Sequence, residues 1–424
     1  MPLDIIVVGA GIAGLFTAIA LSARGHHVTV LEKQPTHEAA GGPIGLQPGA
    51  VRVMKAYGLG ETFSKNLRQG PEDTWYWRRY DSGEVLIQRQ VKSYAKTFGT
   101  ESWSFTRQRL RDLLAEKAKK SGVDVRLGCQ IAAVDEEGPA VRFADGSELR
   151  ADLVVGADGI RSTVRNCVLP QDEAKVTTVL RAWMVHIPLE NLQQDSALLP
   201  YLQGVNFWLG PGHSITAATM PDNNVYNLTL FVEGGDDDGF EQVKQSFQNF
   251  EPTITRLLSD MPAMERYLWR VSEVSPLPTW VSKSGRVVIL GDAAHAMVPF
   301  AAQGASQCVE DAGALAECLS RHDEADIPKL LRIFETIRKP RAESTAARSA
   351  ARRVMYHLPN GPEQQARDKR MKRQVQSYEP DRQVWKGEHI DEPPDINSSL
   401  HDPYLMGHDV IDYAKRVLNW QLRK

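Results

Sequence analysis

The sequence contains little cysteine, and its four cysteines lie far apart. None of them belongs to a C-x-x-C pair or has the Cys/His spacing of a zinc site, so we predict neither a disulfide framework nor a metal site. A chain with so few cysteines is typical of the reducing cytoplasm, where we expect this protein. The four are Cys129, Cys167, Cys308 and Cys318.

An excess of charge of one sign is also absent. Fifty Lys and Arg against 53 Asp and Glu leave a net charge of −3, which gives no general attraction to nucleic acid or acidic lipid. Hydrophobic residues at 42% and charged residues at 24% exclude disordered, collagen-like and multi-span membrane classes. A length of 424 residues predicts two or three domains, without an internal repeat.

Only one uncharged run, residues 5–23, approaches the length of a membrane-spanning helix. Gly9, Gly11 and Gly14 interrupt it, and β-branched residues before the glycines give way to helix formers after them. The residues before it also lack the positive charge of a signal peptide. We therefore interpret the run as strand, turn and helix, and expect no transmembrane segment.

This first unit carries a chemical signal. Gly9, Gly11 and Gly14 form a G-x-G-x-x-G turn, which allows close backbone approach to a pyrophosphate and presents free N–H groups at a helix N-terminus. A second strand, residues 27–32, ends in Glu32, an acid suited to the hydroxyls of a ribose. The combination of strand, turn, helix, strand and terminal acid predicts dinucleotide binding and leaves the dinucleotide open.

Two further segments follow the same pattern. Residues 152–162 form a strand that runs into a turn containing Asp158, after a predicted hairpin with Asp145-Gly146 at its tip. Residues 285–295 form another strand that ends at Asp292, and helical periodicity resumes beyond Gly304. Taken alone, Asp292 fits either a ligand contact or a helix N-cap.

The order of these motifs along the chain is more specific than any one of them. They are GAGIAGL, VLEK, RQRLRDLLAEKA beginning at Arg107, GADGIRS, and GDAAHAMVPFAAQGASQCVEDA. The set, over roughly residues 1–350, resembles the FAD-dependent aromatic-ring monooxygenases, in the branch of salicylate hydroxylase and 6-hydroxynicotinate 3-monooxygenase. The resemblance implies a single-component enzyme that holds FAD and is reduced by NADH or NADPH. It also implies that O2 is activated as a flavin C4a-hydroperoxide, which hydroxylates an aromatic ring.

The resemblance assigns cofactor roles to particular residues. The glycines of the first turn would face the pyrophosphate, and Glu32 would face the adenosine ribose. The backbone near Ile131 would face the adenine. The loop at residues 299–305 would present N–H groups to the flavin edge that becomes anionic on reduction. Because the chain has no second G-x-G-x-x-G, NAD(P)H would bind transiently at a shared surface. The predicted cofactor residues are Gly9, Gly11, Gly14, Glu32, Gly45, Arg107, Ile131, Asp158, Asp292, Gly304 and Ala305.

The substrate side is expected between residues 181 and 280, where strand patterns predict an antiparallel sheet that the hairpin at 73–97 joins. By the resemblance, Arg181 would orient the substrate and His213 would act as a base. Arg181 and His213 could instead be packing residues with no role in substrate binding. The tyrosine that relatives carry before a proline is replaced by Met220, with Tyr226 as a substitute, and His295 is interpreted as a packing residue.

We therefore predict an α/β fold with a Rossmann-type FAD-binding domain, an interleaved antiparallel substrate domain and a helical C-terminal region. The expected ranges are 1–72, 98–180 and 281–340 for the first, 73–97 and 181–280 for the second, and 341–424 for the third. The last region should end in an amphipathic helix from about 409 to 422, packed on the enzyme or on a second subunit or serving a membrane surface or partner.

The predicted function is NAD(P)H- and O2-dependent hydroxylation of a small phenolic, salicylate-like or indole-type substrate. Epoxidation or dehydrogenation of a non-phenolic substrate, or a non-catalytic FAD-fold binding protein, are the alternatives. We expect a monomer or homodimer.

Overall fold

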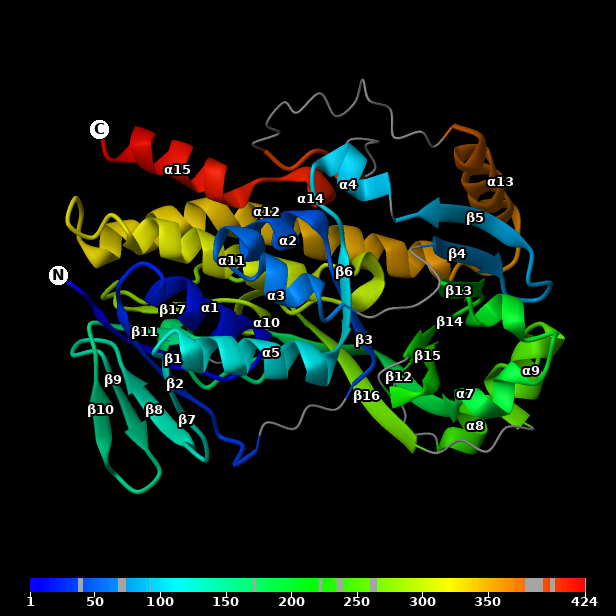
Figure 1. Ribbon diagram of the computed structural model, residues 1–424, viewed down its shortest axis with the longest axis horizontal. Helices are drawn as coiled ribbons and strands as arrows, with labels where there is room; N and C mark the ends of the chain where they lie inside the picture. The colour runs from blue at the N-terminus through cyan, green and yellow to red at the C-terminus, as the bar shows by residue number, and fades with distance from the viewer. Residues whose placement is uncertain are drawn as a thin grey trace.

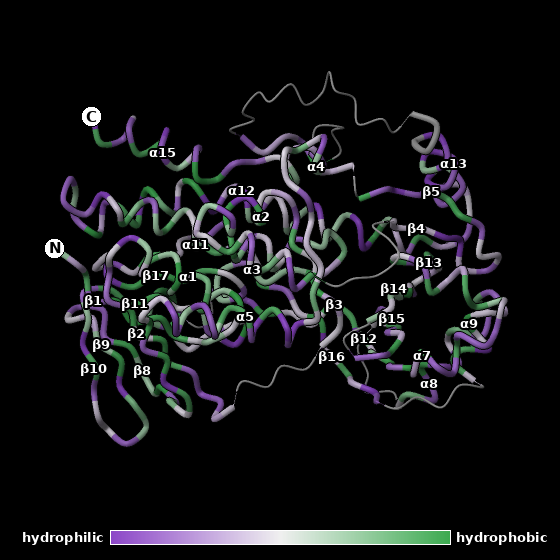
Figure 2. Tube along the Cα trace, in the orientation of Figure 1, coloured by the Kyte–Doolittle hydropathy of each residue, from purple (hydrophilic) through white to green (hydrophobic). Residues whose placement is uncertain are grey.

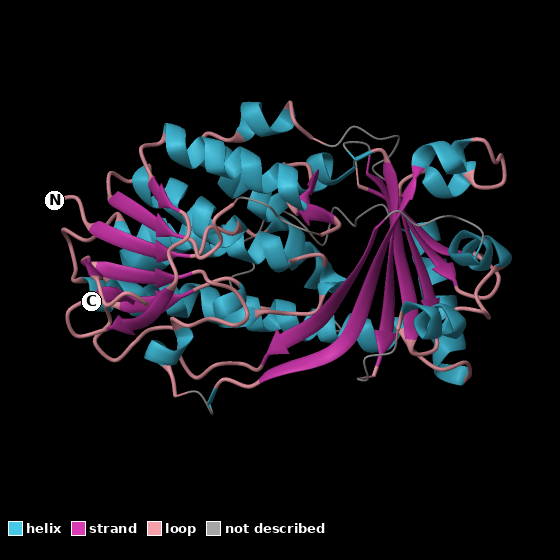
Figure 3. Ribbon diagram, turned by 90° about the horizontal axis from the view of Figure 1, so that it is seen from below, coloured by secondary structure: helices cyan, strands magenta, loops and turns pink. Residues whose placement is uncertain are grey.

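The computed structural model describes residues 1–36, 41–67, 74–91, 93–170, 173–220, 223–234, 239–259, 265–377, 392–396 and 401–423. Two sheets lie at opposite ends of the molecule, and long helices run beside and between them (Figures 1 and 3). Both chain termini lie at the end that holds the first sheet.

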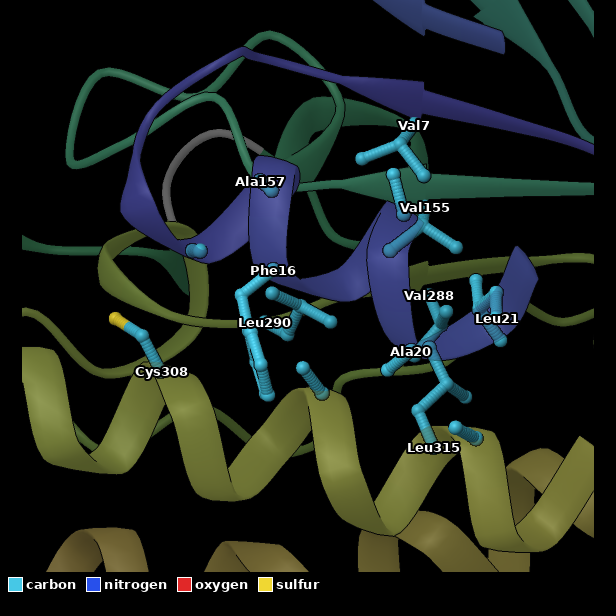
Figure 4. Packing of buried hydrophobic residues seen from close by; sticks show 14 of the residues in the cluster. Val7, Phe16, Ala20, Leu21, Val155, Ala157, Val288, Leu290, Cys308 and Leu315 are labelled. Atoms are coloured by element: carbon cyan, nitrogen blue, oxygen red, sulfur yellow. The ribbon is translucent and has the colours of Figure 1, made fainter. Parts of the chain in front are cut away.

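The first sheet has five parallel strands, and its strands β11 and β17 are apolar and buried throughout, as expected for a sheet covered on both faces. Helix α1 (Ile12–Ser22) packs between this sheet and α11 (Gly304–Leu319), as Figure 4 shows for Phe16 and Leu315. The strands, in spatial order, are β17 (Val287–Ile289), β11 (Leu153–Gly156), β1 (Asp4–Val8), β2 (His27–Leu31) and β7 (Asp124–Arg126).

Two small sheets complete this half. The predicted hairpin is confirmed: Gly146 has φ +86°, and its strands pair antiparallel. A two-stranded sheet brings the segment after residue 41 beside the start of α5. The strands are β8 (Ile131–Asp135), β9 (Ala140–Phe143) and β10 (Glu148–Arg150) in one sheet, and β3 (Pro43–Leu46) and β6 (Trp103–Thr106) in the other.

The second large sheet has seven strands and includes the predicted hairpin. The hairpin joins through a parallel pair, β4 with β13, so the sheet is mixed where we expected antiparallel pairing only. The strands, in spatial order, are β16 (Glu265–Val274), β12 (Val176–Pro188), β15 (Val225–Glu233), β14 (His213–Met220), β13 (Val205–Gly210), β4 (Thr74–Arg79) and β5 (Val85–Gln90).

One face of this sheet is closed by short helices with an apolar core of their own. Those helices are α7 (Leu189–Gln193), α8 (Phe240–Ser246) and α9 (Pro252–Ser259). The α/β class with a Rossmann-type domain, a separate sheet domain and a helical C-terminal region is thus confirmed.

The C-terminal helices pack back on the first half. Helix α12 (Ile327–Tyr356) continues through Pro340, so the expected boundary at residue 340 falls inside a helix. Val410, Ala414 and Leu418 of α15 (Val410–Gln421) are buried against the main core, as expected for an amphipathic helix packed on the enzyme. Figure 2 shows α13 (Pro362–Ser377) as mostly hydrophilic.

The remaining helices are α2 (Pro48–Ala56), α3 (Gly60–Ser64), α4 (Ser93–Phe98), α5 (Arg107–Lys120), α6 (Arg165–Val168), α10 (Asp292–His295) and α14 (His401–Gly407). In the described part of the chain, no helix has both the length and the apolar character needed to cross a membrane.

Candidate active site

A cavity of about 1020 Å³ lies between the two halves of the molecule. Its walls include the glycine-rich turn after β1, the turns after β11 and β17, and one face of the seven-stranded sheet. In open parallel sheets, ligands bind in the crevice outside the carboxyl ends of the strands, which is where these turns lie.

The three glycines of the first turn have different surroundings. Gly9 has φ +102°, and a Cβ there would lie 2.5 Å from the carbonyl oxygen of Ala157. A Cβ on Gly14 would lie 1.8 Å from the carbonyl oxygen of Gly9, so this position admits only glycine. A Cβ on Gly11, in contrast, would meet nothing within 4 Å, and Gly11 lines the cavity. The turn therefore leaves space at the N-terminus of α1 that a phosphate can fill.

Glu32 lies at the end of β2, beside this turn. Its carboxylate accepts hydrogen bonds from the backbone N–H groups of Ala10 at 2.8 Å and Gln34 at 2.9 Å. Arg111 donates from Nε to the carbonyl oxygen of Ala10 at 3.1 Å, and its guanidinium lies 4.0 Å from Glu32. Sequence reasoning missed Arg111, although it follows Arg107 by one helical turn on α5.

Arg107 and Asp292 bring opposite charges to the cavity. Each is the first residue of its helix, α5 or α10, and both are exposed and line the cavity. Gly45 also lines it, and a Cβ on Gly41 would lie 2.9 Å from Nε of Arg107. A guanidinium and a carboxylate on one wall suit a phosphate and the hydroxyls of a ribityl chain.

Five of the eleven predicted cofactor residues do not line the cavity: Gly9, Gly14 and Glu32, described above, and Asp158 and Ile131. The Asp158 carboxylate accepts hydrogen bonds from the N–H groups of Thr163 at 2.7 Å and Val164 at 3.2 Å, so it holds the turn from which Gly159 lines the cavity. Ile131 begins β8, two residues after Cys129, whose N–H donates to the carbonyl oxygen of Glu32 at 2.7 Å.

The predicted flavin loop forms the N-terminus of α11. Ala302 has φ +52°, Gln303 is the N-cap, and Gly304 and Ala305 open a helix of 16 residues. Both residues line the cavity, and a Cβ on Gly304 would meet nothing within 4 Å. The N-terminus of a long helix stabilises negative charge, as the anionic edge of a reduced flavin requires.

A buried ionic cluster supports this loop from behind. Arg338 of α12 donates to Glu310 at 3.0 Å and to Asp311 at 2.8 Å, and Asp311 accepts from the N–H of Gly291 at 2.9 Å. Burial by itself raises the pKa of Asp311, but the charges of His295 and Arg338 outweigh burial and lower it to about 2. His295 is buried at 2.6 Å from Asp311, in agreement with its interpretation as a packing residue.

The opposite wall of the cavity is aromatic. The rings of Trp77 and Phe207 are stacked with centroids 4.9 Å apart and planes 11° from parallel, and Trp75 lies beside both. Tyr356, at the end of α12, accepts a hydrogen bond from Nε1 of Trp77 at 2.7 Å. Polar groups on the same wall come from Ser214, Thr216, Asn227 and Thr229. A flat aromatic wall beside a few polar groups suits a small aromatic ring.

Arg181 and His213 do not line this cavity. Both pair with Val232, whose side chain packs against the short helices, whereas the neighbouring Phe231 lines the cavity. His213 stacks edge-on against Phe247 at 5.4 Å in that outer layer. Since successive residues of a strand point to opposite faces, the substrate roles predicted for Arg181 and His213 disagree with their placement.

Tyr226 is likewise remote from the cavity. It is fully buried in the outer core, where its hydroxyl donates to the carbonyl oxygen of Tyr201 at 2.8 Å, and burial raises its pKa. Among the described residues, no group of three or more His, Cys, Asp or Glu is arranged to hold a metal ion.

Comparison with known proteins gives concordant results. The family model described as FAD binding domain matches residues 2–349. The FAD-dependent monooxygenase OpS4 of Beauveria bassiana (strain ARSEF 2860) is 31% identical over 427 residues, covering 97% of this chain and 96% of that protein. The 6-hydroxynicotinate 3-monooxygenase of Bordetella bronchiseptica (strain ATCC BAA-588 / NCTC 13252 / RB50) is 30% identical, covering 80% and 88%. The crystal structure of FqzB superposes with a TM-score of 0.80 at 26% identity, covering 99% of this chain and 93% of that one.

Proposed function

The chain belongs to the FAD binding domain family and is an FAD-dependent monooxygenase of the aromatic-hydroxylase type; from that premise we propose that it hydroxylates a small aromatic substrate with NAD(P)H and O2. The observation that carries the proposal is a single cavity with a phosphate cradle and a helix N-terminus on one side and an aromatic wall on the other.

The residues of the cradle fit FAD. The open space at Gly11 would receive the pyrophosphate, Arg107 and Asp292 would hold the phosphate and ribityl region, and Gly304 would face the flavin edge. Glu32, beside the glycine turn, would face the adenosine ribose. When bound, FAD supplies the chemistry that protein side chains lack: it accepts two electrons from NAD(P)H and activates O2 for transfer of one oxygen atom.

The chain's own residues select and place the ring. Trp77 and Phe207, stacked on each other, offer the ligand an aromatic surface, and Asn227 and Thr229 offer hydrogen bonds to ring substituents. A phenol, a salicylate-like acid or an indole meets both conditions, as does the hydroxylated ring in the name of the 6-hydroxynicotinate relative. NAD(P)H would bind transiently at a shared surface of this cavity, for which Arg161, an exposed lining residue, offers a positive charge.

A second candidate reaction rests on a specific observation. Arg181, His213 and Tyr226, the expected phenol-activating groups, all lie outside the cavity lining. Epoxidation or dehydrogenation of a non-phenolic substrate needs none of them, so it stays the alternative.

The test is a screen of phenols, benzoates and indoles for substrate-stimulated NAD(P)H oxidation by the FAD-loaded protein. Oxygen uptake and product analysis separate ring hydroxylation from peroxide release without product. We expect hydroxylated product from at least one aromatic class, and the Gly11→Val variant serves as the matched control without FAD. If only desaturated or epoxidised products form, the alternative replaces the proposal.

A further inference from the structure

Three side chains form a continuous hydrogen-bonded row from the cavity to the surface. Oγ of Ser214, which lines the cavity, lies 2.8 Å from Nε2 of His357. Nδ1 of the same imidazole lies 2.8 Å from Oε1 of Glu233. The His357 side chain is 2% exposed, whereas that of Glu233 is 40% exposed, so the row begins in the cavity and ends in solvent.

We propose that Ser214, His357 and Glu233 are a proton relay that removes the proton of a hydroxyl on the aromatic substrate and passes it to water. The proposal rests on the proposed hydroxylation and deepens it, because an electrophilic oxygen attacks a phenolate ring more readily than a phenol. It also supplies the deprotonating group that Arg181 and His213 do not provide from the other face of the sheet.

The step is balanced and moves no electrons between molecules. The substrate O–H bond breaks as a new O–H bond forms on Oγ of Ser214, which gives its own proton to Nε2 of His357. Nδ1 then releases its proton to the carboxylate of Glu233, and Glu233 passes it to water. The net change is one proton transferred from substrate to solvent. Ser214 and Glu233 return to their starting forms, and His357 ends as the Nε2–H tautomer, which a ring flip or proton exchange with solvent converts back before the next turnover.

Secondary structure holds the row in register. Ser214 is the second residue of β14, Glu233 the last of β15, and His357 the C-cap of α12. The N–H of Gly212 donates to the carbonyl oxygen of His357 at 3.0 Å, and the N–H of Glu233 donates to that of Gly212 at 3.0 Å. The helix end and both strand ends are thereby joined by backbone bonds.

Burial favours the neutral imidazole of His357 that the relay needs. Burial lowers the pKa of His357, and the bond to Glu233 offsets burial only in part. Arg353 of α12, which lies 3.6 Å from Glu233, and His213 of β14 also lower it, and the Phe300 ring packs at 5.4 Å. His357 is therefore neutral and able to accept a proton at neutral pH.

The same three residues do not form a site for covalent catalysis. A serine nucleophile requires free backbone N–H groups to stabilise an oxyanion. Ser214 lies in an interior strand, paired with Leu209 of β13 on one side and Phe231 of β15 on the other, where backbone N–H groups belong to the ladder. The structure favours proton transfer over acyl transfer for this reason.

The test measures ionisation of a bound phenol directly. 4-Nitrophenol is bound to the FAD-loaded protein without NAD(P)H at a pH below its pKa, the pH is raised rapidly by stopped-flow mixing, and the rise of phenolate absorbance is followed in time. We expect fast ionisation of the bound probe in the wild type, because the relay carries its proton to solvent. In Ser214→Ala and His357→Gln, the probe should bind with affinity within a few-fold of wild type but ionise at least about tenfold more slowly.

Turnover provides the second measurement. His357→Gln should slow hydroxylation of a phenol by about 10²-fold or more, Glu233→Gln should slow it less, and imidazole should partly rescue His357→Gly. The matched control is His401→Gln, because His401 makes a similar bond to a serine, Ser344, at 3.0 Å, away from the cavity lining. That variant should leave both the probe and the rate unchanged.

Four outcomes would overturn the relay. Equal rates of probe ionisation in wild type and His357→Gln, at matched affinity, would refute the relay and leave the hydroxylation proposal intact. Hydrolysis of 4-nitrophenyl acetate that depends on Ser214 would replace it with a nucleophilic role. If the protein hydroxylates indoles but neither binds nor ionises any phenol, the relay is wrong and the monooxygenase proposal survives; if no aromatic stimulates NAD(P)H oxidation, both fail.

Discussion

Gly11 and Gly14 of the first turn should affect different properties, FAD binding and folding stability. Gly11→Val should fold with a melting temperature near that of wild type yet lose FAD, because its side chain enters open space that the pyrophosphate needs. Gly14→Val should instead lose stability, since its Cβ would overlap the carbonyl oxygen of Gly9. Flavin absorbance measures bound FAD in the two variants, and thermal unfolding measures their stability. If Gly11→Val retains as much FAD as wild type, the pyrophosphate does not lie at Gly11.

The exposed charged residues of the cradle, Arg107 and Asp292, should contribute to FAD affinity rather than to folding. Arg107→Ala and Asp292→Ala each remove one charged hydrogen-bond partner, worth about 1.5–3 kcal/mol, so FAD should bind about 10- to 150-fold more weakly. Glu32→Ala should weaken FAD less than Gly11→Val does, because it removes one ribose contact without filling space. Flavin fluorescence titration of the apoproteins gives the dissociation constants, and unchanged affinity in both charge variants would refute these contacts.

Adjacent residues of a strand in the seven-stranded sheet point to opposite faces, one toward the cavity and the other toward the outer helices. Thr229→Val, on the cavity face of β15, should raise KM or lower the coupling of NAD(P)H oxidation to product. Arg181→Ala, on the outer face of β12, should lower the melting temperature while kcat/KM and bound FAD stay near wild type. A large loss of coupling in Arg181→Ala at unchanged stability would return this arginine to the substrate site.

The pairing of α11 with α12 depends on buried charge. Because the pKa of Asp311 is lowered from 3.8 to about 2, its contribution to stability is complete above 3.8 and is lost as the pH falls towards 2. Urea unfolding of wild type should therefore show stability decreasing over that interval, and Asp311→Asn should show a shallower decrease. Identical slopes would mean that Asp311 is not held ionised in the folded protein.

A substitution of Arg338 tests the same buried ionic cluster at neutral pH. Arg338→Met leaves Glu310 and Asp311 with one buried cation fewer, so the free energy of unfolding should fall by about 3–5 kcal/mol. The exposed pair Lys65 and Glu61 on α3 offers the control, since Lys65→Met should change it by less than about 1 kcal/mol. Equal effects of the two substitutions would contradict the role assigned to burial.

Both halves of the molecule contribute walls to one cavity, so the cofactor should stabilise the whole protein. At a free FAD concentration of 100 times Kd, the gain should be about 2.7 kcal/mol, and added FAD should give no gain in Gly11→Val. Hydrogen exchange should slow on FAD binding in the turns after β1 and β17 and at the start of α11. Protection limited to residues far from the cavity would argue against a shared site.

Much of the first half follows from short-range patterns. The apolar runs of β1, β11 and β17 predict buried parallel strands, and the glycine spacing predicts the turn before α1, because both depend on neighbours within one element. The Asp145-Gly146 hairpin and the amphipathic face of α15 are confirmed for the same reason. The order of such motifs along the chain was specific enough to indicate the family.

The sequence by itself determined the FAD-binding architecture, the class of enzyme and the motifs that form the cradle, because each depends on residue types at short, fixed separations along the chain. Only the tertiary structure decided which face of a strand meets the cavity, since a shift of one residue reverses it, as Arg181 and His213 show. It also decided the parallel pairing of β4 with β13 and the approach of His357 to Ser214 across 143 positions. Contacts of that range depend on how whole elements pack, and no local pattern specifies them.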